Sequence, residues 1–174
     1  LAPHVDGGAV PGLVAGICRR GETHVDTVGA AAIDGPAVAR DAIFRVASMS
    51  KPVTAVATMI LVEECRLRLD DPLSHYLPEY PREHLASGGK EVTIQNLLTH
   101  TSGIADAYST PEIEEKLDRE SLSFAEMRDA VSAKPLRFVP GDRFEYSNTG
   151  YLMLGEVIRR IVGTSYGAFV HGTL

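Results

Sequence analysis

The 174-residue sequence contains no tryptophan, only two cysteines and no excess of positive charge. Its net charge of −6 argues against a nucleic-acid-binding protein, which would present a basic face to its ligand. No apolar run has the length of a membrane span, because Lys51, Pro52, Thr54 and Glu63 interrupt the apolar stretch that ends at Val62. No basic segment followed by an apolar segment opens the chain, so no secretory signal is visible.

Signals for metal binding are missing as well. The six histidines show no H-E-x-x-H or C-x-x-C spacing of the kind that zinc sites use, so we expect no metal ion. Cys18 and Cys65 lie in apolar contexts, and we expect buried free thiols rather than a disulfide or a reactive cysteine. Such thiols favour the cytoplasm, and a secreted or periplasmic location stays open if a signal peptide has been removed.

The composition that remains, 44% hydrophobic and 23% charged, is ordinary for a soluble globular domain with a buried core. Residues 11–18 and 23–31 predict two strands, and RRGE between them carries a glycine suited to the tight turn of a hairpin. Residues 32–42 have the composition of a loop. Apolar positions at helical spacing then predict a helix from about Ser48 to about Leu69.

Caps and apolar spacing predict further helices downstream. They are a short helix capped by Thr93 and ended with the help of Gly103, a charged helix over 111–118, a helix that Ser123 and Glu126 open and that runs to about Ala133, and an amphipathic helix from Tyr151 to Val162 ended by Gly163. The chain therefore predicts a hairpin and loop over 1–47 and a mostly helical region over 48–174.

Ser48 and Lys51 form an S-x-x-K pattern at the start of the long predicted helix. Residues three apart on a helix share a face, so the pattern sets an amine beside a hydroxyl. A serine becomes a nucleophile when a base takes its proton, and its amide at a helix start can donate to an oxyanion. A lysine with an ordinary pKa of about 10.4 stays protonated at neutral pH, so Lys51 needs burial or a nearby positive charge. Phe44, Val46 and Val53 are the apolar neighbours expected to supply burial.

Simpler interpretations of this stretch stay open. Serine is a favoured helix cap, and a lysine three residues further on is common, so Ser48 and Lys51 alone also describe a helix start. Ser50 is a rival nucleophile, but as the immediate neighbour of Lys51 it points elsewhere, and we interpret it as a helix-surface or supporting hydroxyl.

The tripeptide YSN at 146–148 precedes the last long predicted helix. The phenol of Tyr146 would serve as a proton relay, and the amide of Asn148 would orient a substrate. The alternative is a turn in which Ser147 or Asn148 caps the helix.

Three segments in this order resemble the serine β-lactamase and penicillin-binding-protein superfamily: FRVASMSKPVTAVATMILVEECRLRLDDPLSHYLPEY, VTIQNLLTHTSGI and PGDRFEYSNTGYLMLGEVIRRIVG. The resemblance covers about residues 9–174 and is strongest to the class C β-lactamase-like branch, which includes D-aminopeptidases, DD-peptidases and carboxylesterases. S-x-x-K is a motif of that superfamily. The resemblance implies an α+β fold of the β-lactamase/transpeptidase type, with an antiparallel sheet flanked by helices plus a helical region.

The resemblance also implies a role for each matching residue. Ser48 would be the acylated nucleophile, and Lys51 its base or electrostatic partner. Tyr146 would shuttle the proton, as a phenolate stabilised by Lys51, and Asn148 would hold the carbonyl or amide of the substrate. No metal or organic cofactor is implied.

The third motif of the family, K-T-G or H-x-G on a later strand, is not found. His171-Gly172-Thr173 has similar letters in the wrong order and a helical context. We therefore expect the C-terminal strands to be absent from this chain, which would make it a partial β-lactamase-like domain over 1–174. The alternative is a naturally short form completed by another chain.

Two other motifs are weaker candidates. Residues 163–167 match the G-x-S-x-G nucleophile elbow around Ser165, but a helical pattern precedes them where the elbow needs a strand. Gly163 and Ser165 are better explained as the end of one helix and the cap of the next. His100 adjoins Thr101 and Ser102, and we expect it to order a loop.

The combined prediction is a serine hydrolase that forms an acyl-enzyme at Ser48 on a small ester or amide, most simply a carboxylesterase. A β-lactamase, a D-alanyl-D-alanine carboxypeptidase or a D-aminopeptidase is the alternative, and a non-catalytic binding protein or inactive fragment is another. We expect no nucleic-acid partner and no membrane span. Self-association through an incomplete sheet edge is the one protein contact expected.

Overall fold

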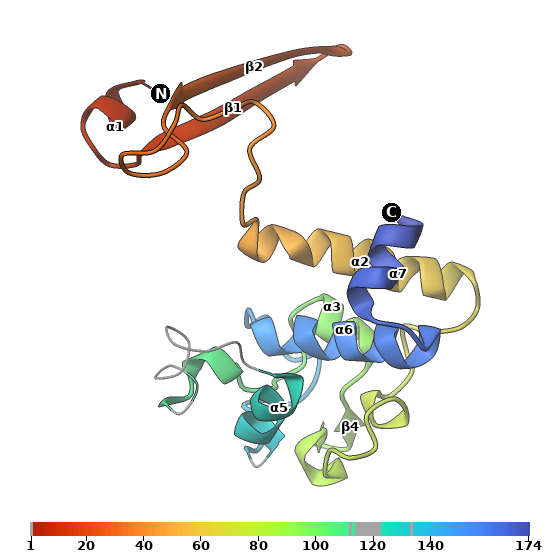
Figure 1. Ribbon diagram of the computed structural model, residues 1–174. Helices are drawn as coiled ribbons and strands as arrows, with labels where there is room; N and C mark the ends of the chain where they lie inside the picture. Colours follow the sequence, from red (N-terminus) through yellow and green to blue (C-terminus); the bar gives the residue numbers. More distant parts are fainter. Residues whose placement is uncertain (1, 112, 114–122, 133) are drawn as a thin grey trace. The chain divides into compact units, whose positions relative to one another are not determined.

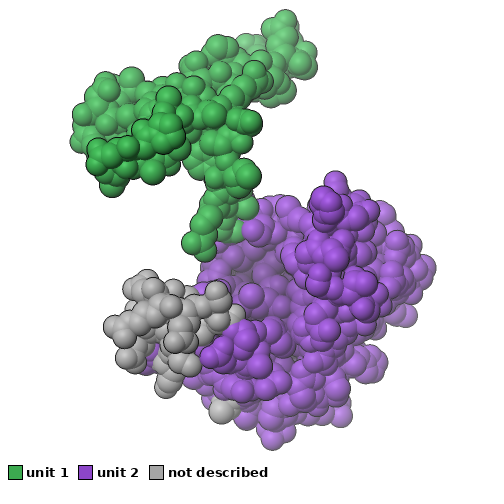
Figure 2. All heavy atoms as spheres, viewed as in Figure 1, with its two compact units in different colours: residues 1–47 green, residues 48–174 purple. Residues whose placement is uncertain are grey.

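The computed structural model describes residues 2–111, 113, 123–132 and 134–174. The chain divides into two compact units, residues 1–47 and residues 48–174 (Figures 1 and 2). The charged helix predicted over 111–118 lies mostly outside the described residues, and so do Glu112, Glu114 and Glu115, which we expect to form a solvated face. No helix in the described parts of the chain is both long enough and apolar enough to cross a membrane.

The first unit is built on the predicted hairpin. Strand β1 (Gly12–Arg19) pairs antiparallel with β2 (Glu22–Gly29), in a register that runs from Gly12 opposite Gly29 to Arg19 opposite Glu22. The two turn residues, Arg20 and Gly21, have φ of 53° and 85°. Positive φ at both positions is the geometry of a type I′ turn, whose twist matches that of the strands. A short helix, α1 (Ala2–Asp6), precedes the hairpin and was not predicted.

The expected burial of the two thiols was wrong. Cys18 lies on β1 and is exposed, because a two-stranded hairpin has too few strands to enclose a side chain. Cys65 is exposed as well, just beyond the end of a helix. Both are free thiols at the surface of the described structure.

The second unit begins with a 3₁₀ turn, η1 (Ala47–Met49), that leads into α2 (Ser50–Glu63). Pro52 lies in the first turn of α2, where its missing N–H is tolerated. The helix is shorter than the prediction of an end near Leu69, because Cys65 takes a left-handed backbone with φ of 56°. The amides of Cys65 and Arg66 then bond back to the carbonyls of Val62 and Leu61, which is the Schellman arrangement.

Loops and short elements follow α2. They are η2 (Leu73–His75), η3 (Arg82–His84), β3 (Ala86–Ser87), β4 (Lys90–Glu91) and η4 (Ala107–Ser109). The antiparallel pair β3–β4 was not predicted, because two-residue strands are too short for a periodic signal. Gly88 and Gly89, both with positive φ, form the turn between them.

The downstream helices follow their caps. Thr93 caps α3 (Ile94–Leu98), and the box of Ser123 and Glu126 opens α5 (Phe124–Ser132), both as predicted. The role given to Gly103 was wrong, because α3 ends at Leu98, well before that glycine. Gly103 instead packs with φ of 76° against the carbonyl of Phe138.

The central element is α6 (Asn148–Val162), and the last helix is α7 (Tyr166–Thr173). Helix α6 begins three residues before the predicted Tyr151, because the Ser147 hydroxyl caps it through the Gly150 amide, and it ends at Gly163 as predicted. It packs against α2, α3, α5 and α7 (Figure 1). The core around it includes the fully buried side chains of Leu61, Leu73, Leu77, Val92, Ile94, Leu154, Val157 and Ile158.

Cys65 and Gly163 hold the same left-handed backbone at the ends of two helices, so reciprocal substitutions test that geometry. A Cβ at Gly163 would meet nothing within 4 Å, so Gly163→Ala adds backbone strain alone. We expect Gly163→Ala to lower the free energy of unfolding by about 1 kcal/mol, and Cys65→Gly to raise it by up to about 1 kcal/mol. Urea unfolding measures both, and a destabilised Cys65→Gly variant would contradict this account of the α2 terminus.

Candidate active site

Ser48 and Lys51 lie at the junction of η1 and α2, with their side chains in contact. The Lys51 ammonium donates to Ser48 Oγ at 3.2 Å. The residue just before Ser48, Ala47, has φ of 45°, a backbone region that an alanine rarely adopts. Such local strain is common where a turn presents a functional side chain. Ser48 itself is exposed, so its hydroxyl is accessible from solvent.

Tyr146 reaches Ser48 from the segment that precedes α6. Its phenol donates to Ser48 Oγ at 2.8 Å, across 98 positions of sequence. The Lys51 ammonium also lies 4.7 Å from the centroid of the Tyr146 ring. Hydrogen bonding by Lys51, and then by Ser48, lowers the pKa of the Tyr146 phenol below its ordinary value. The phenol is therefore closer to ionisation than a free tyrosine, which suits it to accept a proton.

Asn148 occupies the first position of α6 and faces Lys51. Its Oδ1 accepts from the Lys51 ammonium at 2.8 Å, while its Nδ2 donates to a carboxylate oxygen of Asp106 at 3.0 Å. The structure thus brings together all four residues predicted for the site, Ser48, Lys51, Tyr146 and Asn148. Asp106 was missed, because an isolated aspartate in a loop carries no motif.

Within the second unit, Val53, one of the apolar neighbours expected to bury Lys51, is itself 39% exposed. Lys51 is half-buried, and the aromatic rings beside its ammonium are those of Tyr146 and Tyr151. Tyr151 lies one turn into α6, so two aromatic rings lie within cation–π distance of the charge.

His100 also belongs to this group, although it was expected only to order a loop. Its ring stacks on Tyr146 with centroids 4.6 Å apart, and Nδ1 accepts from the Ser147 amide at 3.2 Å. A ring nitrogen that accepts an N–H is unprotonated. Burial, and then the positive charge of Lys51, lower the pKa of His100. The imidazole that stacks on the Tyr146 ring is therefore neutral.

The rival serines lie outside this group. Ser50 is exposed in the first turn of α2. Ser165 caps α7 by accepting from the Ala168 amide at 3.1 Å, which confirms that G-x-S-x-G is a helix junction here. His171 lies in the last turns of α7, in a helix and not on a strand.

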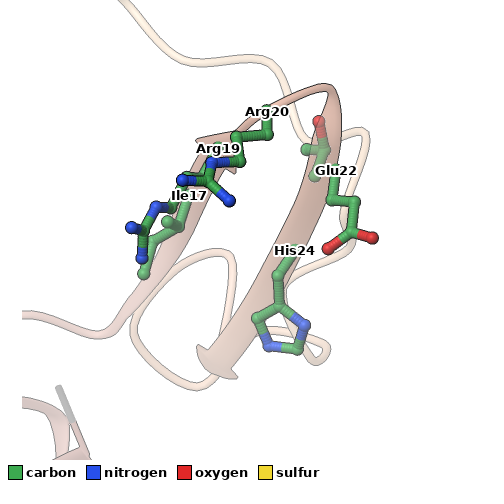
Figure 3. A pocket seen from close by; sticks show the side chains of 6 residues that line it. Ile17, Arg19, Arg20, Glu22 and His24 are labelled. Carbon is green, nitrogen blue, oxygen red and sulfur yellow. The ribbon is translucent and has the colours of Figure 1, made fainter.

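A recess of about 710 Å³ at the hairpin tip is a separate feature of the first unit (Figure 3). All six residues that line it are exposed, and His24 pairs with Asp26. They are Ile17, Arg19, Arg20, Glu22, Thr23 and His24. No serine or cysteine is among them. Across the described residues, no group of three or more His, Cys, Asp or Glu side chains could hold a metal ion.

Comparison with known proteins shows the family of this chain. The family model described as Beta-lactamase matches residues 1–174. The chain belongs to the Beta-lactamase family. The predicted resemblance and the β-lactamase/transpeptidase-like fold class are therefore confirmed.

Several proteins similar to this chain are named as hydrolases. Esterase EstB of Burkholderia gladioli is 35% identical over 145 residues, which cover 78% of this chain and 36% of the esterase. A D-stereospecific amidohydrolase from Streptomyces has a similar structure, with a TM-score of 0.82, 29% identity, and coverage of 95% of this chain and 48% of that one. The D-amino acid amidase of Ochrobactrum anthropi, complexed with L-phenylalanine, has a TM-score of 0.84 and 27% identity over 100% of this chain and 48% of that one. This chain thus spans about half the length of those two structures, and less of the esterase.

The lowered pKa of Tyr146 depends on Lys51, so removing the charge tests the pair. We expect Lys51→Met to raise the pKa of Tyr146, because methionine retains bulk but supplies neither charge nor hydrogen bond. The ultraviolet absorbance of tyrosinate, followed during an alkaline titration and compared with Tyr146→Phe, isolates this residue. Lys90→Met, at an exposed position of β4, is the matched control and should leave the titration unchanged. An unchanged Tyr146 pKa in Lys51→Met would contradict the pairing.

The lowered pKa of His100 makes folding pH-dependent. In the unfolded chain, His100 binds a proton near the ordinary pKa of about 6.5, whereas in the folded protein it becomes protonated only at a lower pH. The stabilisation is therefore complete above that value and is lost as the pH falls through the folded pKa. We expect the free energy of unfolding to decline on acidification less steeply in His100→Asn, since asparagine tolerates the left-handed φ of 57° but does not titrate. Equal slopes in both proteins would show that His100 does not carry the effect.

Proposed function

We propose that Ser48 is the nucleophile of an acyl-transfer site that hydrolyses small esters or amides. One observation carries this proposal. Ser48 Oγ accepts hydrogen bonds from both the Tyr146 phenol, at 2.8 Å, and the Lys51 ammonium, at 3.2 Å. A serine between a phenol of lowered pKa and a cation has a proton acceptor at hydrogen-bonding distance. A serine that only capped a helix would need neither of these two hydrogen bonds.

The proposed reaction begins with Tyr146 as a phenolate. It takes the Ser48 proton while Oγ forms a bond to the substrate carbonyl carbon, whose oxygen becomes an oxyanion. Collapse of this intermediate breaks the bond to the leaving alcohol or amine, which receives the proton from Tyr146. A water molecule then attacks the acyl-enzyme, gives its proton to Tyr146, and releases the acid as Ser48 regains a proton.

The other two residues have supporting roles in this proposal. Lys51 stabilises the phenolate through its charge, and its position beside the Tyr146 ring supports that role. Asn148 offers the remaining hydrogen of its Nδ2 group to the carbonyl of the substrate, because the other hydrogen is bonded to Asp106.

An ester is the favoured substrate class, and the likeness to an esterase supports it. An amide of a D-amino acid is the second candidate, supported by the likeness to a D-stereospecific amidohydrolase and a D-amino acid amidase. The β-lactam and D-alanyl-D-alanine substrates of the wider family stay in the proposal as further classes to be assayed.

Intact mass after incubation with an activated ester, and separately with a penicillin, tests the nucleophile. We expect an acyl adduct in the wild-type protein and in Ser165→Ala, and none in Ser48→Ala. Tyr146→Phe should slow formation of the adduct by about a hundredfold or more, because it removes the general base. Ser50→Ala serves as the matched control for an exposed serine in the same helix and should be acylated like the wild type.

An adduct that persists in Ser48→Ala would refute the assignment of the nucleophile. The absence of any adduct in the wild-type chain would favour the alternative of a non-catalytic binding protein or an inactive form. An adduct with the ester but not with the penicillin would support the esterase over the β-lactamase.

A further inference from the structure

The orientation of the Asn148 amide is set by the chemistry of its two neighbours. Lys51 has only hydrogens to donate, so Oδ1 must face it, and the carboxylate of Asp106 can only accept, so Nδ2 must face that side. If the amide rotated by half a turn, its NH2 group would face the Lys51 ammonium and its oxygen would face the Asp106 carboxylate, and neither pair could form a hydrogen bond. The amide is therefore held in one orientation by a cation on one edge and an anion on the other.

Asp106 is itself held by a complete set of donors. One carboxylate oxygen accepts from the backbone and side-chain amides of Asn148, at 3.4 Å and 3.0 Å. The other accepts from the Thr149 hydroxyl at 3.2 Å and the Tyr108 amide at 3.3 Å. The carboxylate thus joins the start of η4 to the first turn of α6, where the helix dipole favours a negative charge.

Lys51 has a long side chain that loses much rotamer freedom when it is held in one place. Its ammonium donates to Ser48 and to Asn148, and the bond to Asn148 is the shorter of the two, at 2.8 Å against 3.2 Å. Asp106 accepts from the opposite edge of the Asn148 amide and so holds Oδ1 toward Lys51. The series Asp106, Asn148, Lys51 therefore ends at the nucleophile.

We propose that Asp106 is the positioning residue of this site: by accepting from Nδ2 of Asn148, its carboxylate fixes Oδ1 toward Lys51 and so holds the ammonium beside Ser48 and Tyr146. This inference deepens the proposed function and rests on it for its catalytic consequence. The geometric part concerns four side chains and does not depend on turnover.

The charge of Asp106 and its positioning role have opposite effects on Tyr146, which makes them separable. A negative charge nearby raises the pKa of the phenol, although it is the smallest of the influences on Tyr146, whereas the bond to Lys51 is the largest and lowers it. If Asp106 acted through its charge alone, Asp106→Asn would lower the Tyr146 pKa. If it positions Lys51, the same substitution raises it, because asparagine replaces one of the two acceptor oxygens by a donor and so weakens the hold on the Asn148 amide and, through it, on the ammonium.

The experiment is the tyrosinate titration of the folded 174-residue chain, with Tyr146→Phe subtracted. We expect Asp106→Asn and Asn148→Ala each to raise the Tyr146 pKa, and the double variant to raise it no further than Asn148→Ala alone. Asp71→Asn is the matched control, since Asp71 is a hydrogen-bonded carboxylate that accepts from the Tyr76 hydroxyl and the Arg68 amide, away from Asn148. A general loss of stability would affect both aspartate variants, but only Asp106→Asn should shift Tyr146.

A fall or no change in the Tyr146 pKa of Asp106→Asn would overturn the proposal, as would a further rise when Asp106→Asn is added to Asn148→Ala. In a protein that acylates Ser48, Asp106→Asn should also slow adduct formation by about tenfold to a hundredfold, and an unchanged rate would overturn the proposal equally. If the wild-type chain forms no adduct, the proposed function fails while the titration still decides the role of Asp106.

Discussion

The packing of helix α6 against α2 is the constraint on which the candidate site depends. Lys51 projects from the first turn of α2, and Asn148 is the first residue of α6, so the contact between them exists only while the two helices keep their register. A slip of one helical turn, about 5.4 Å, would separate the Lys51 ammonium from Asn148 Oδ1. Fully buried side chains on both helices, such as Leu61, Leu154 and Ile158, resist that slip because packed interiors tolerate little displacement.

One positive charge organises the electrostatics of the site. The ammonium of Lys51 lowers the pKa of the Tyr146 phenol by stabilising its ionised form, and it lowers the pKa of His100 by opposing a second cation. The two stacked rings thus respond to the same charge in chemically opposite ways, one toward an anion and the other toward a neutral base. Asp106 supplies the compensating negative charge from the other side of Asn148.

Two residues with left-handed backbone lie at the site, Ala47 and His100. Ala47 and His100, with φ of 45° and 57°, both hold left-handed conformations directly beside the site, one before the nucleophile and the other beneath the phenol. Such conformations are unfavourable for residues other than glycine and persist where surrounding contacts determine them. The bonds of His100 to the 145–147 segment, through its carbonyl and its ring, are contacts of that kind.

Local sequence was sufficient to predict the elements that follow from short-range chemistry. The hairpin, the caps at Thr93, Ser123 and Ser165, and the helix end at Gly163 were all predicted, because each depends on residues within a few positions of one another. The end of α2 was not, since a left-handed cysteine carries no signal that distinguishes it from a helical one. Ser48, Lys51, Tyr146 and Asn148 were likewise selected by motif and order alone. The spacing also predicted the contact of Ser48 with Lys51. Only the tertiary structure decided that Tyr146 contacts Ser48, that Asn148 contacts Lys51, that His100 stacks on Tyr146 and that Asp106 holds Asn148. These contacts join residues 42 to 98 positions apart and arise from helix packing, which sequence spacing does not encode.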